Sequence, residues 1–578
     1  MNRISRSCSV FWESAPSAAA FVPEDFSQEQ RMFAELSEKF AESEIAPVSG
    51  DIEAMAPGLM PSLLRKAGEL GLLSPDIAQE WGGMGLDIRS SMLITEGLCG
   101  NGSFIASHTD HTAFGTLPIA WFGSDEQKAR YLPALATGDK LAAFALTEPG
   151  SGSDARGALT KATLSADGRS YLVSGSKQFI TNSGFADIIV TFAKVDGRLT
   201  AFLVDTDSPG VALGNEEKKT GIWGSSTRSV TYDEVKVPVE NLLLEVGQGH
   251  VVAFNVLNAG RLKLAAQCVG TAKTALKYAL QYGRERHQFG KPIARFGLVQ
   301  EKLARLGGLV YVSESMLYRA CGRIDETLAG FAAEGFDRAV AIGLHAAECS
   351  INKVFASESL DAVADETVQI FGGNGYIRDY PADQLFRDAR INRIFAGTNE
   401  INRLLIARAL VRGVQDLDRD YQPAQIDAYG HDDSDPTVRE ACAVAVARRA
   451  LLVVARMAID KHGAALDSEQ EVLGLLADLA IQIYALESAL LRSCQAVQAQ
   501  GVEQAAAKLD LLRCYFSDAA PALYRLIVEA LAAVAPAHEF ELQLHAVAGL
   551  LRCVGLNTIP VRRRIAIRLE EAGRYVVA

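Results

Sequence analysis

A glycine- and serine-rich segment, Thr147-Glu148-Pro149-Gly150-Ser151-Gly152-Ser153-Asp154, holds the first residues whose types and spacing could do chemistry. A turn of this composition exposes backbone N–H groups and hydroxyls, which suit the binding of a phosphate or of the edge of a flavin ring. Phe144 and Leu146 lead into the turn. Taken alone, the segment is explained equally well as an ordinary turn between two elements, so its chemistry depends on the motifs that follow it.

Two later segments are also weak evidence when each is taken by itself. Residues 175–184 read as a strand and a turn, which predicts a β-hairpin with Phe179 in the core. Residues 284–293 contain Arg286 and Phe289 and read as the end of a helix followed by a tight loop. The rigid donor fork of an arginine nevertheless pairs well with a pyrophosphate.

The last two segments lie further along the chain. Residues 369–376 hold Gln369 and the pair Gly372-Gly373, and glycines allow a backbone to approach a nucleotide closely. Residues 387–401 read Arg-Asp-Ala-Arg-Ile-Asn-Arg-Ile-Phe-Ala-Gly-Thr-Asn-Glu-Ile, with Ala396 directly before the Gly-Thr pair.

In this order, the five segments closely resemble the acyl-CoA dehydrogenase superfamily, and the resemblance covers roughly residues 22–412. The added length and helical character of residues 437–578 resemble the larger, very-long-chain type. The resemblance implies FAD as cofactor, an acyl-CoA as substrate, an electron-transfer flavoprotein as electron acceptor and a homodimer. It also implies that segments 284–293 and 369–376 reach the FAD of the partner subunit.

The resemblance carries over to individual residues. The backbone at residue 146 and Thr147 would contact the pyrimidine side of the flavin, and Ser153 would reach the pyrophosphate. Thr181 would hydrogen-bond flavin N5, and Phe179 would pack on the ring. The full set of implied FAD contacts is Phe144, Leu146, Thr147, Gly152, Ser153, Phe179, Thr181, Arg286, Phe289, Gln369, Gly372, Gly373, Thr398 and Glu400.

The catalytic base of the family is missing from this sequence. Most members carry a Glu immediately before Gly-Thr, where it removes the α-proton of the thioester, and this chain has Ala396. A minority carry the base on a helix just before an Arg, and this chain has Gly260 before Arg261. A positioned general base contributes about 10²–10⁴-fold to a rate. Ala396 keeps the backbone N–H that polarises the thioester carbonyl in the family, and Arg261 is expected to face the substrate channel.

Three alternatives for the activity stay open at this point. The first is an otherwise ordinary dehydrogenase, catalysing α,β-desaturation with hydride transfer to flavin N5, in which Ala396 replaces the base by nature or by engineering. The second is a flavin-dependent monooxygenase or oxidase on the same fold. The third is a non-catalytic homologue that binds acyl-CoA without converting it.

The pattern along the chain predicts an α+β protein. Its parts are an N-terminal helical domain, a small β-barrel or β-sandwich domain, a C-terminal four-helix-type domain and an appended helical domain. Short β-branched runs such as Ile188–Ala193 define the β domain, and a polar stretch ending at Pro436 predicts a linker. The expected parts are a disordered start over 1–22, then 23–142, 143–248, 249–412, the linker 413–436, and 437–578.

Composition narrows the class of protein further. A net charge of −13 argues against nucleic acid as a partner. The nine Cys form no Cys-x-x-Cys pair, which indicates a reducing compartment, and we expect a cytoplasmic protein with an organelle matrix as the alternative. No apolar run reaches the ~20 residues that span a bilayer. Arg562-Arg563-Arg564 is expected to be a solvated face, with peripheral membrane contact left open, and His108 and His111 are not expected to bind a metal.

Overall fold

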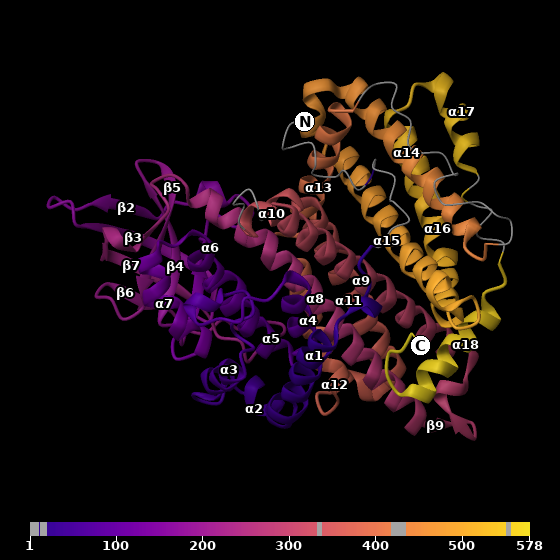
Figure 1. Cartoon of the computed structure of the whole chain (residues 1–578), viewed down its shortest axis with the longest axis horizontal. Helices are drawn as coiled ribbons and strands as arrows, with labels where there is room; N and C mark the ends of the chain where they lie inside the picture. Colours follow the sequence, from indigo (N-terminus) through magenta and orange to yellow (C-terminus); the bar gives the residue numbers. More distant parts are fainter. Residues whose placement is uncertain are drawn as a thin grey trace.

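The computed structural model describes residues 11, 20–331, 338–417, 435–548, 550 and 556–577. Most of the predicted disordered start and of the predicted linker lies outside these residues. The described chain forms a helical layer, a β domain, a central set of long helices and a second helical bundle, in that order (Figure 1). The α+β prediction is confirmed.

Short helices build the N-terminal part. Ser27 accepts a hydrogen bond from the Gln30 N–H, and Ser124 accepts one from the Gln127 N–H, so both predicted helix starts are capped by serine. The helices are α1 (Gln28–Phe40), α2 (Ser49–Glu53), α3 (Leu59–Glu69), α4 (Ile88–Gly97), α5 (Gly102–Thr109), α6 (Leu117–Phe122) and α7 (Asp125–Thr137).

The β domain is one mixed sheet with strand order β6-β7-β3-β2-β4-β5-β8. Its strands are β1 (Ala142–Ala145), β2 (Lys161–Leu164), β3 (Ser170–Thr181), β4 (Ile188–Val195), β5 (Arg198–Asp205), β6 (Val211–Leu213), β7 (Thr227–Pro238) and β8 (Leu242–Leu243). The sheet is not purely antiparallel, because β1 pairs with β4 in parallel.

Strand β4 is buried on both faces, and its residues alternate between two cores. Ile188, Val190 and Phe192 pack with helix α7 on one side of the sheet. Ile189 and Ala193 pack between strands on the other side. This two-sided burial explains why the run reads as almost continuously apolar.

Long helices make up the central part. They are α8 (Gly249–Glu285), α9 (Gly297–Phe331), α10 (Arg338–Leu344), α11 (Ala346–Phe371), α12 (Pro381–Ala389) and α13 (Asn399–Gln415), with a small hairpin of β9 (His287–Gln288) and β10 (Lys291–Pro292) after α8. Helix α13 continues three residues into the segment predicted as a linker.

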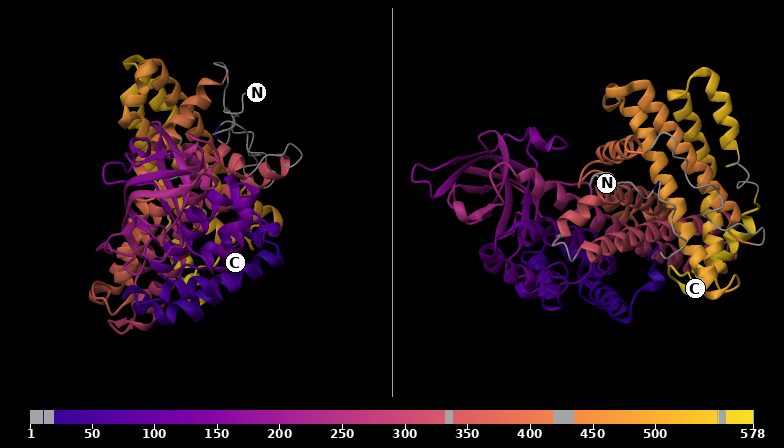
Figure 2. Two further views of the ribbon diagram at one scale, coloured as in Figure 1. Left: turned by 90° about the vertical axis from the view of Figure 1, so that its left-hand side faces the viewer. Right: turned by 45° about the horizontal axis from the view of Figure 1, so that its top comes forward.

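The appended bundle packs on α9 and α13 and shares one hydrophobic core with the central helices (Figure 2). Its helices are α14 (Val438–His462), α15 (Gln470–Gln500), α16 (Ala506–Val534), α17 (Ala537–Val547) and α18 (Ile559–Ala572). Among the described helices, α15 alone is long and apolar enough to cross a membrane, and most of it is buried in this core. Arg562 and Arg564 of α18 pair with Asp518 and Asp510 of α16.

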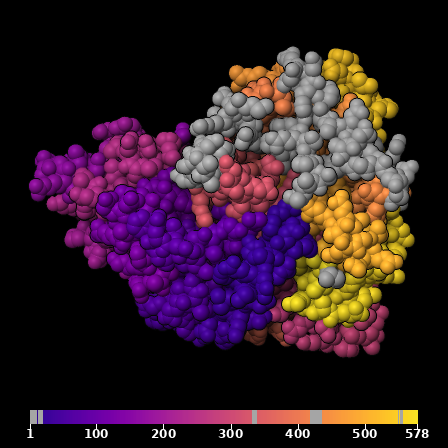
Figure 3. All heavy atoms as spheres, viewed as in Figure 1, coloured from indigo at the N-terminus to yellow at the C-terminus, as the bar shows by residue number. Residues whose placement is uncertain are grey.

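The N-terminal residues reach the appended bundle directly, and the space-filling view shows the two in contact (Figure 3). Gln495 of α15 donates a hydrogen bond to the Ala20 carbonyl at 2.9 Å. Arg492, one turn earlier, pairs with Glu24 at 2.9 Å and with Glu314 of α9 at 2.6 Å. Residues 20–24 and helix α15, far apart in the chain, are therefore joined through partly buried polar contacts.

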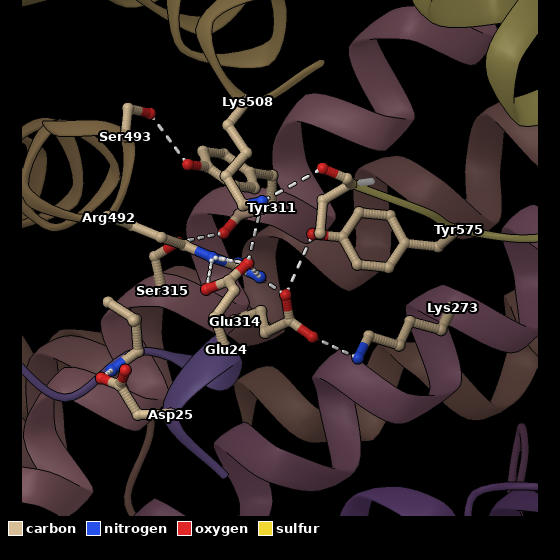
Figure 4. Close-up of polar contacts among 12 residues, drawn as sticks. Glu24, Asp25, Lys273, Tyr311, Glu314, Ser315, Arg492, Ser493, Lys508 and Tyr575 are labelled. Carbon is tan, nitrogen blue, oxygen red and sulfur yellow. Dashed lines mark hydrogen bonds and ion pairs between the residues drawn. The ribbon is translucent and has the colours of Figure 1, made fainter. Parts of the chain in front are cut away.

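Glu314 is the centre of this buried network (Figure 4). It also pairs with Lys273 of α8 at 2.5 Å and accepts a hydrogen bond from the Tyr575 hydroxyl at 3.0 Å. Burial acts against ionisation of Glu314, but Lys273 and Arg492 outweigh it and lower its pKa to about 2. The carboxylate is thus charged at neutral pH and bridges three helices and the C-terminal residues.

Candidate functional site

The turn at Ala396 has an uncommon backbone conformation. Ala396 has a φ of +53° and Gly397 a φ of +82°, so two consecutive residues lie in the left-handed region. Thr398 follows as the N-cap of α13 and accepts a hydrogen bond from the Ile401 N–H at 3.3 Å. Positive φ is uncommon outside glycine, and such residues concentrate at functional sites.

Arg261 holds this turn from helix α8. Its Nε donates a hydrogen bond to the Ala396 carbonyl at 3.2 Å, and its Nη1 donates one to Asn258 Oδ1 at 2.8 Å. Burial lowers the pKa of Arg261 to about 10, which leaves it charged at neutral pH. The residue that follows Gly260 therefore links the two positions at which the family carries its base, through a buried cation.

Phe114 closes the alternative base position. A Cβ atom built on Gly260 would overlap the Phe114 ring. The same ring lies 5.6 Å from the ring of Phe144, which in turn lies 4.9 Å from Phe192 in the core of the β domain. This aromatic series joins Gly260 of α8 to β1.

The segment after β1 is fixed to β3 by a buried ion pair. Lys177 Nζ lies 2.8 Å from Glu148 Oε1 and donates a second hydrogen bond to the Leu146 carbonyl at 3.2 Å. Burial acts to raise the pKa of Glu148, but hydrogen bonds from the Leu159 N–H and from Lys177 lower it overall. Gly152 and Ser153 remain exposed, and a Cβ on Gly152 would touch nothing within 4 Å.

Phe179 is not a core residue, so the simple hairpin interpretation is wrong on this point. It has a φ of +59° and is 57% exposed, at an irregularity in the pairing of β3 with β7. Thr181 is half-buried two residues later. The irregularity therefore turns a large ring out of the sheet, where it is free to pack on a planar ligand.

A second group of predicted residues lies elsewhere on the chain. Phe289, with a φ of +49°, is 94% exposed on the β9–β10 hairpin, and Arg286 is exposed beside it. At the end of α11, Phe371 stacks on Tyr282 of α8 with ring centroids 4.1 Å apart. The exposed residues Gln369, Gly372 and Gly373 therefore lie near the hairpin.

The predicted site residues thus form two groups that do not meet within one chain. Figure 1 shows the β9 hairpin at the opposite end of the molecule from the β domain. The first group, on β1, β3, α8 and the 396 turn, contains Phe144, Leu146, Thr147, Gly152, Ser153, Phe179, Thr181, Gly260, Arg261, Ala396 and Thr398. Glu400 lies exposed in the first turn of α13.

Sequence reasoning missed several residues that shape the site. The sequence assigns no role to Phe114, the Glu148–Lys177 pair, Lys353 or Asn402, although Glu148 lies in the segment 147–154 and Lys177 in the segment 175–184. Their contacts join segments far apart in the chain, so spacing alone does not indicate them. His108 and His111 are engaged by the backbone, with Nε2 bonded to the Leu72 and Leu135 carbonyls, respectively.

Comparisons with known proteins agree with this arrangement. Three domain models named for acyl-CoA dehydrogenase, N-terminal, middle and C-terminal, match residues 27–139, 143–235 and 247–411. A further model of an acyl-CoA dehydrogenase C-terminal domain matches residues 446–548.

Individual relatives extend the match to the whole chain. A probable acyl-CoA dehydrogenase of Bacillus subtilis is 44% identical over 570 residues, covering 96% of both chains. The human very long-chain specific acyl-CoA dehydrogenase is 40% identical over 59% of this chain and 51% of its own length. The crystal structure of an acyl-CoA dehydrogenase complexed with FAD from Bacillus anthracis has a TM-score of 0.94 at 42% identity and covers 99% of this chain and 100% of its own. The chain belongs to the acyl-CoA dehydrogenase family, in the larger form that carries a second C-terminal helical domain.

Proposed function

We propose that this protein binds FAD and an acyl-CoA thioester, and that α,β-desaturation is the reaction for which its site is built. The observation that carries the proposal is the left-handed turn at Ala396 and Gly397, held by Arg261 of α8, whose neighbour Gly260 lies against Phe114 and through it reaches Phe144 of β1. This is where the family-typical segments come together within one chain.

The described residues fit FAD. Phe179 presents an unburied ring, and Gly152 and Ser153 leave an open, hydroxyl-bearing turn beside it. When bound, FAD supplies a hydride acceptor at flavin N5. Arg286, Phe289, Gln369 and the glycine pair lie too far along the same molecule to complete this site, so we propose that they complete the site of the partner in a homodimer.

The N–H of Ala396 is the group left to act on the substrate. A backbone N–H directed at the thioester carbonyl stabilises the negative charge that develops as the α-proton leaves. Alanine cannot take up that proton. Two carboxylates near the turn are engaged elsewhere: Glu358 accepts from Arg403 and Asn399, and hydrogen bonds at the start of α13 lower the pKa of Glu400. We infer that the site binds and polarises the thioester but removes the α-proton slowly.

Anaerobic bleaching of the FAD-loaded protein by a panel of acyl-CoAs tests this proposal. Slow bleaching that becomes fast in Ala396→Glu supports a desaturase without its base. Rapid bleaching of the unaltered protein would show that another residue serves as base. No spectral change with any acyl-CoA would contradict acyl-CoA binding.

A flavin-dependent oxidase or monooxygenase is the second candidate, because both base positions of the family are empty. Oxygen consumption with a non-thioester substrate, unchanged in Ala396→Glu, would favour it. For the dehydrogenase we propose an electron-transfer flavoprotein as the acceptor, which is tested by its reduction in the presence of substrate. The cytoplasmic location stays a prediction.

A further inference from the structure

The carbonyl groups of the 396 turn are all held by side chains from other elements. Arg261 of α8 donates to the Ala396 carbonyl at 3.2 Å. Lys353 of α11 donates to the Gly397 carbonyl at 2.8 Å, and Asn402 of α13 donates to the same oxygen at 2.8 Å and to the Thr398 carbonyl at 3.0 Å. With these carbonyls fixed, the peptide planes that carry the N–H groups of residues 397–399 have fixed directions as well.

Lys353 is the most unusual of these donors. Its side chain is fully buried, and its Nζ has Asn399 Oδ1 at 2.7 Å as a second acceptor. Both acceptors are uncharged, and within the described chain no carboxylate forms an ion pair with this amine. Burying an ammonium group without a paired anion costs free energy. The packing and hydrogen bonds around Lys353 must compensate for this cost.

The groups around Lys353 come from three helices. Burial lowers its pKa to about 7, and Arg261 acts in the same direction. Cys268 of α8 acts in the opposite direction and more strongly than Arg261, and Glu358 of α11 and Glu400 of α13 also act in the opposite direction. Glu358 is already paired with Arg403 at 2.8 Å. Arg261, and Lys353 below about pH 7, therefore place positive charge on the turn.

We propose that Lys353 is a positioning residue. It holds the turn of Ala396 to Thr398 through the Gly397 carbonyl, and it places positive charge beside the side chain at position 396. The first half of this inference rests on the proposed function, because a fixed backbone at this turn matters for catalysis only if a thioester binds there. The second half is independent of it. Any carboxylate introduced at position 396 must ionise more easily while Lys353 is present, because an opposite charge nearby favours the charged form.

The Ala396→Glu variant makes this effect measurable without turnover. The unaltered protein lacks that carboxylate, so the infrared difference spectrum between the variant and the parent reports the titration of Glu at position 396 alone. The comparison uses full-length protein carrying Ala396→Glu with Lys353, Lys353→Met or Lys353→Gln. Methionine removes both the charge and the hydrogen bonds, whereas glutamine keeps N–H donors and removes the charge.

We expect both replacements of Lys353 to raise the pKa of the introduced carboxyl by about one unit or more. Amide hydrogen exchange over residues 396–399 should be faster with methionine than with glutamine. Lys277→Met, which removes an exposed lysine of α8 that pairs with Glu42 at 2.9 Å, is the matched control and should change neither quantity. If Lys353→Met does not fold, Lys353→Gln decides. An unchanged titration in a folded Lys353→Gln protein would overturn the inference, whether or not any acyl-CoA is converted.

Discussion

The ring of Phe114 occupies the space that any side chain at Gly260 would need, and Gly260 is buried in helix α8. This contact distinguishes Gly260 from Ala396, the two positions at which the family's base is missing. Ala396 is half-buried and already carries a side chain in its turn, whereas the Phe114 ring fills position 260. The site therefore has one position at which a base can be supplied by a single substitution.

We expect Gly260→Glu to leave desaturation unrestored and to lower the free energy of unfolding, because the new side chain must displace a packed ring. Overpacking of this kind typically costs about 1–3 kcal/mol. Chemical denaturation and flavin bleaching measure the two effects. Phe114→Ala alone is the control, and Gly260→Glu with Phe114→Ala tests whether space was the obstacle. Restored bleaching in Gly260→Glu alone would contradict the closed position.

Ala396→Glu should raise the rate of flavin reduction by about 10²–10⁴-fold, because it adds a general base next to the N–H that polarises the thioester. The thermal midpoint should hardly change, since alanine and glutamate meet similar strain at a φ of +53°. Ala396→Gln has the same size without the charge and is the control. Equal rates in the Glu and Gln variants would exclude proton removal by the new side chain.

Asp388 should make stability fall as pH rises. It accepts a hydrogen bond from the Ile222 N–H at 2.5 Å, and burial, followed by the nearby Glu53, raises its pKa to about 7. Because this value lies above the unfolded-state value of 3.8, the folded protein holds the extra proton. The contribution is complete below about pH 4 and is lost as pH rises through 7.

Asp388→Asn is the corresponding test, because asparagine keeps an acceptor for Ile222 and cannot ionise. We expect the variant to gain stability relative to the parent between about pH 4 and pH 7, by up to about 4 kcal/mol. Denaturation midpoints of both proteins, measured across this range, give the difference. A difference that does not vary with pH would show that Asp388 titrates normally.

Arg492→Met should loosen the contact between the appended bundle and the rest of the chain. The substitution removes the ion pairs that Arg492 forms with Glu24 at 2.9 Å and with Glu314 at 2.6 Å. Removal of one partner of a buried pair costs about 3–5 kcal/mol. Limited proteolysis and thermal unfolding report the loss. Arg525→Met, which removes the exposed Arg525–Glu529 pair, is the control and should cost less than about 1 kcal/mol.

Local signals made much of the fold predictable. The serine caps at Ser27 and Ser124 and the apolar run of β4 depend on residues within a few positions of one another. The contacts that shape the site join residues that are far apart in the chain. Phe114 meets Gly260, and Lys353 meets Gly397, only after the helices pack. Arg492 and Glu24 are 468 positions apart in the chain, and neither residue type predicts the other.

Phe179 shows that a sequence pattern can also predict the burial of a side chain wrongly. Its place in an alternating strand predicts burial, but the irregular pairing of β3 with β7 turns the ring outward. Such an irregularity depends on the register of two strands about fifty residues apart. The resemblance of the motif implies a flavin contact for this ring, and that role stays a prediction.

The separation of the site residues into two distant groups has a genetic consequence. In the proposed homodimer, each site takes one group from each subunit, so two different defective chains can repair one another. A chain carrying Arg286→Ala and a chain carrying Phe179→Ala should each bind FAD poorly when produced alone. Produced together, they should form mixed dimers in which one site has both groups intact and the other has neither, and flavin content should partly recover.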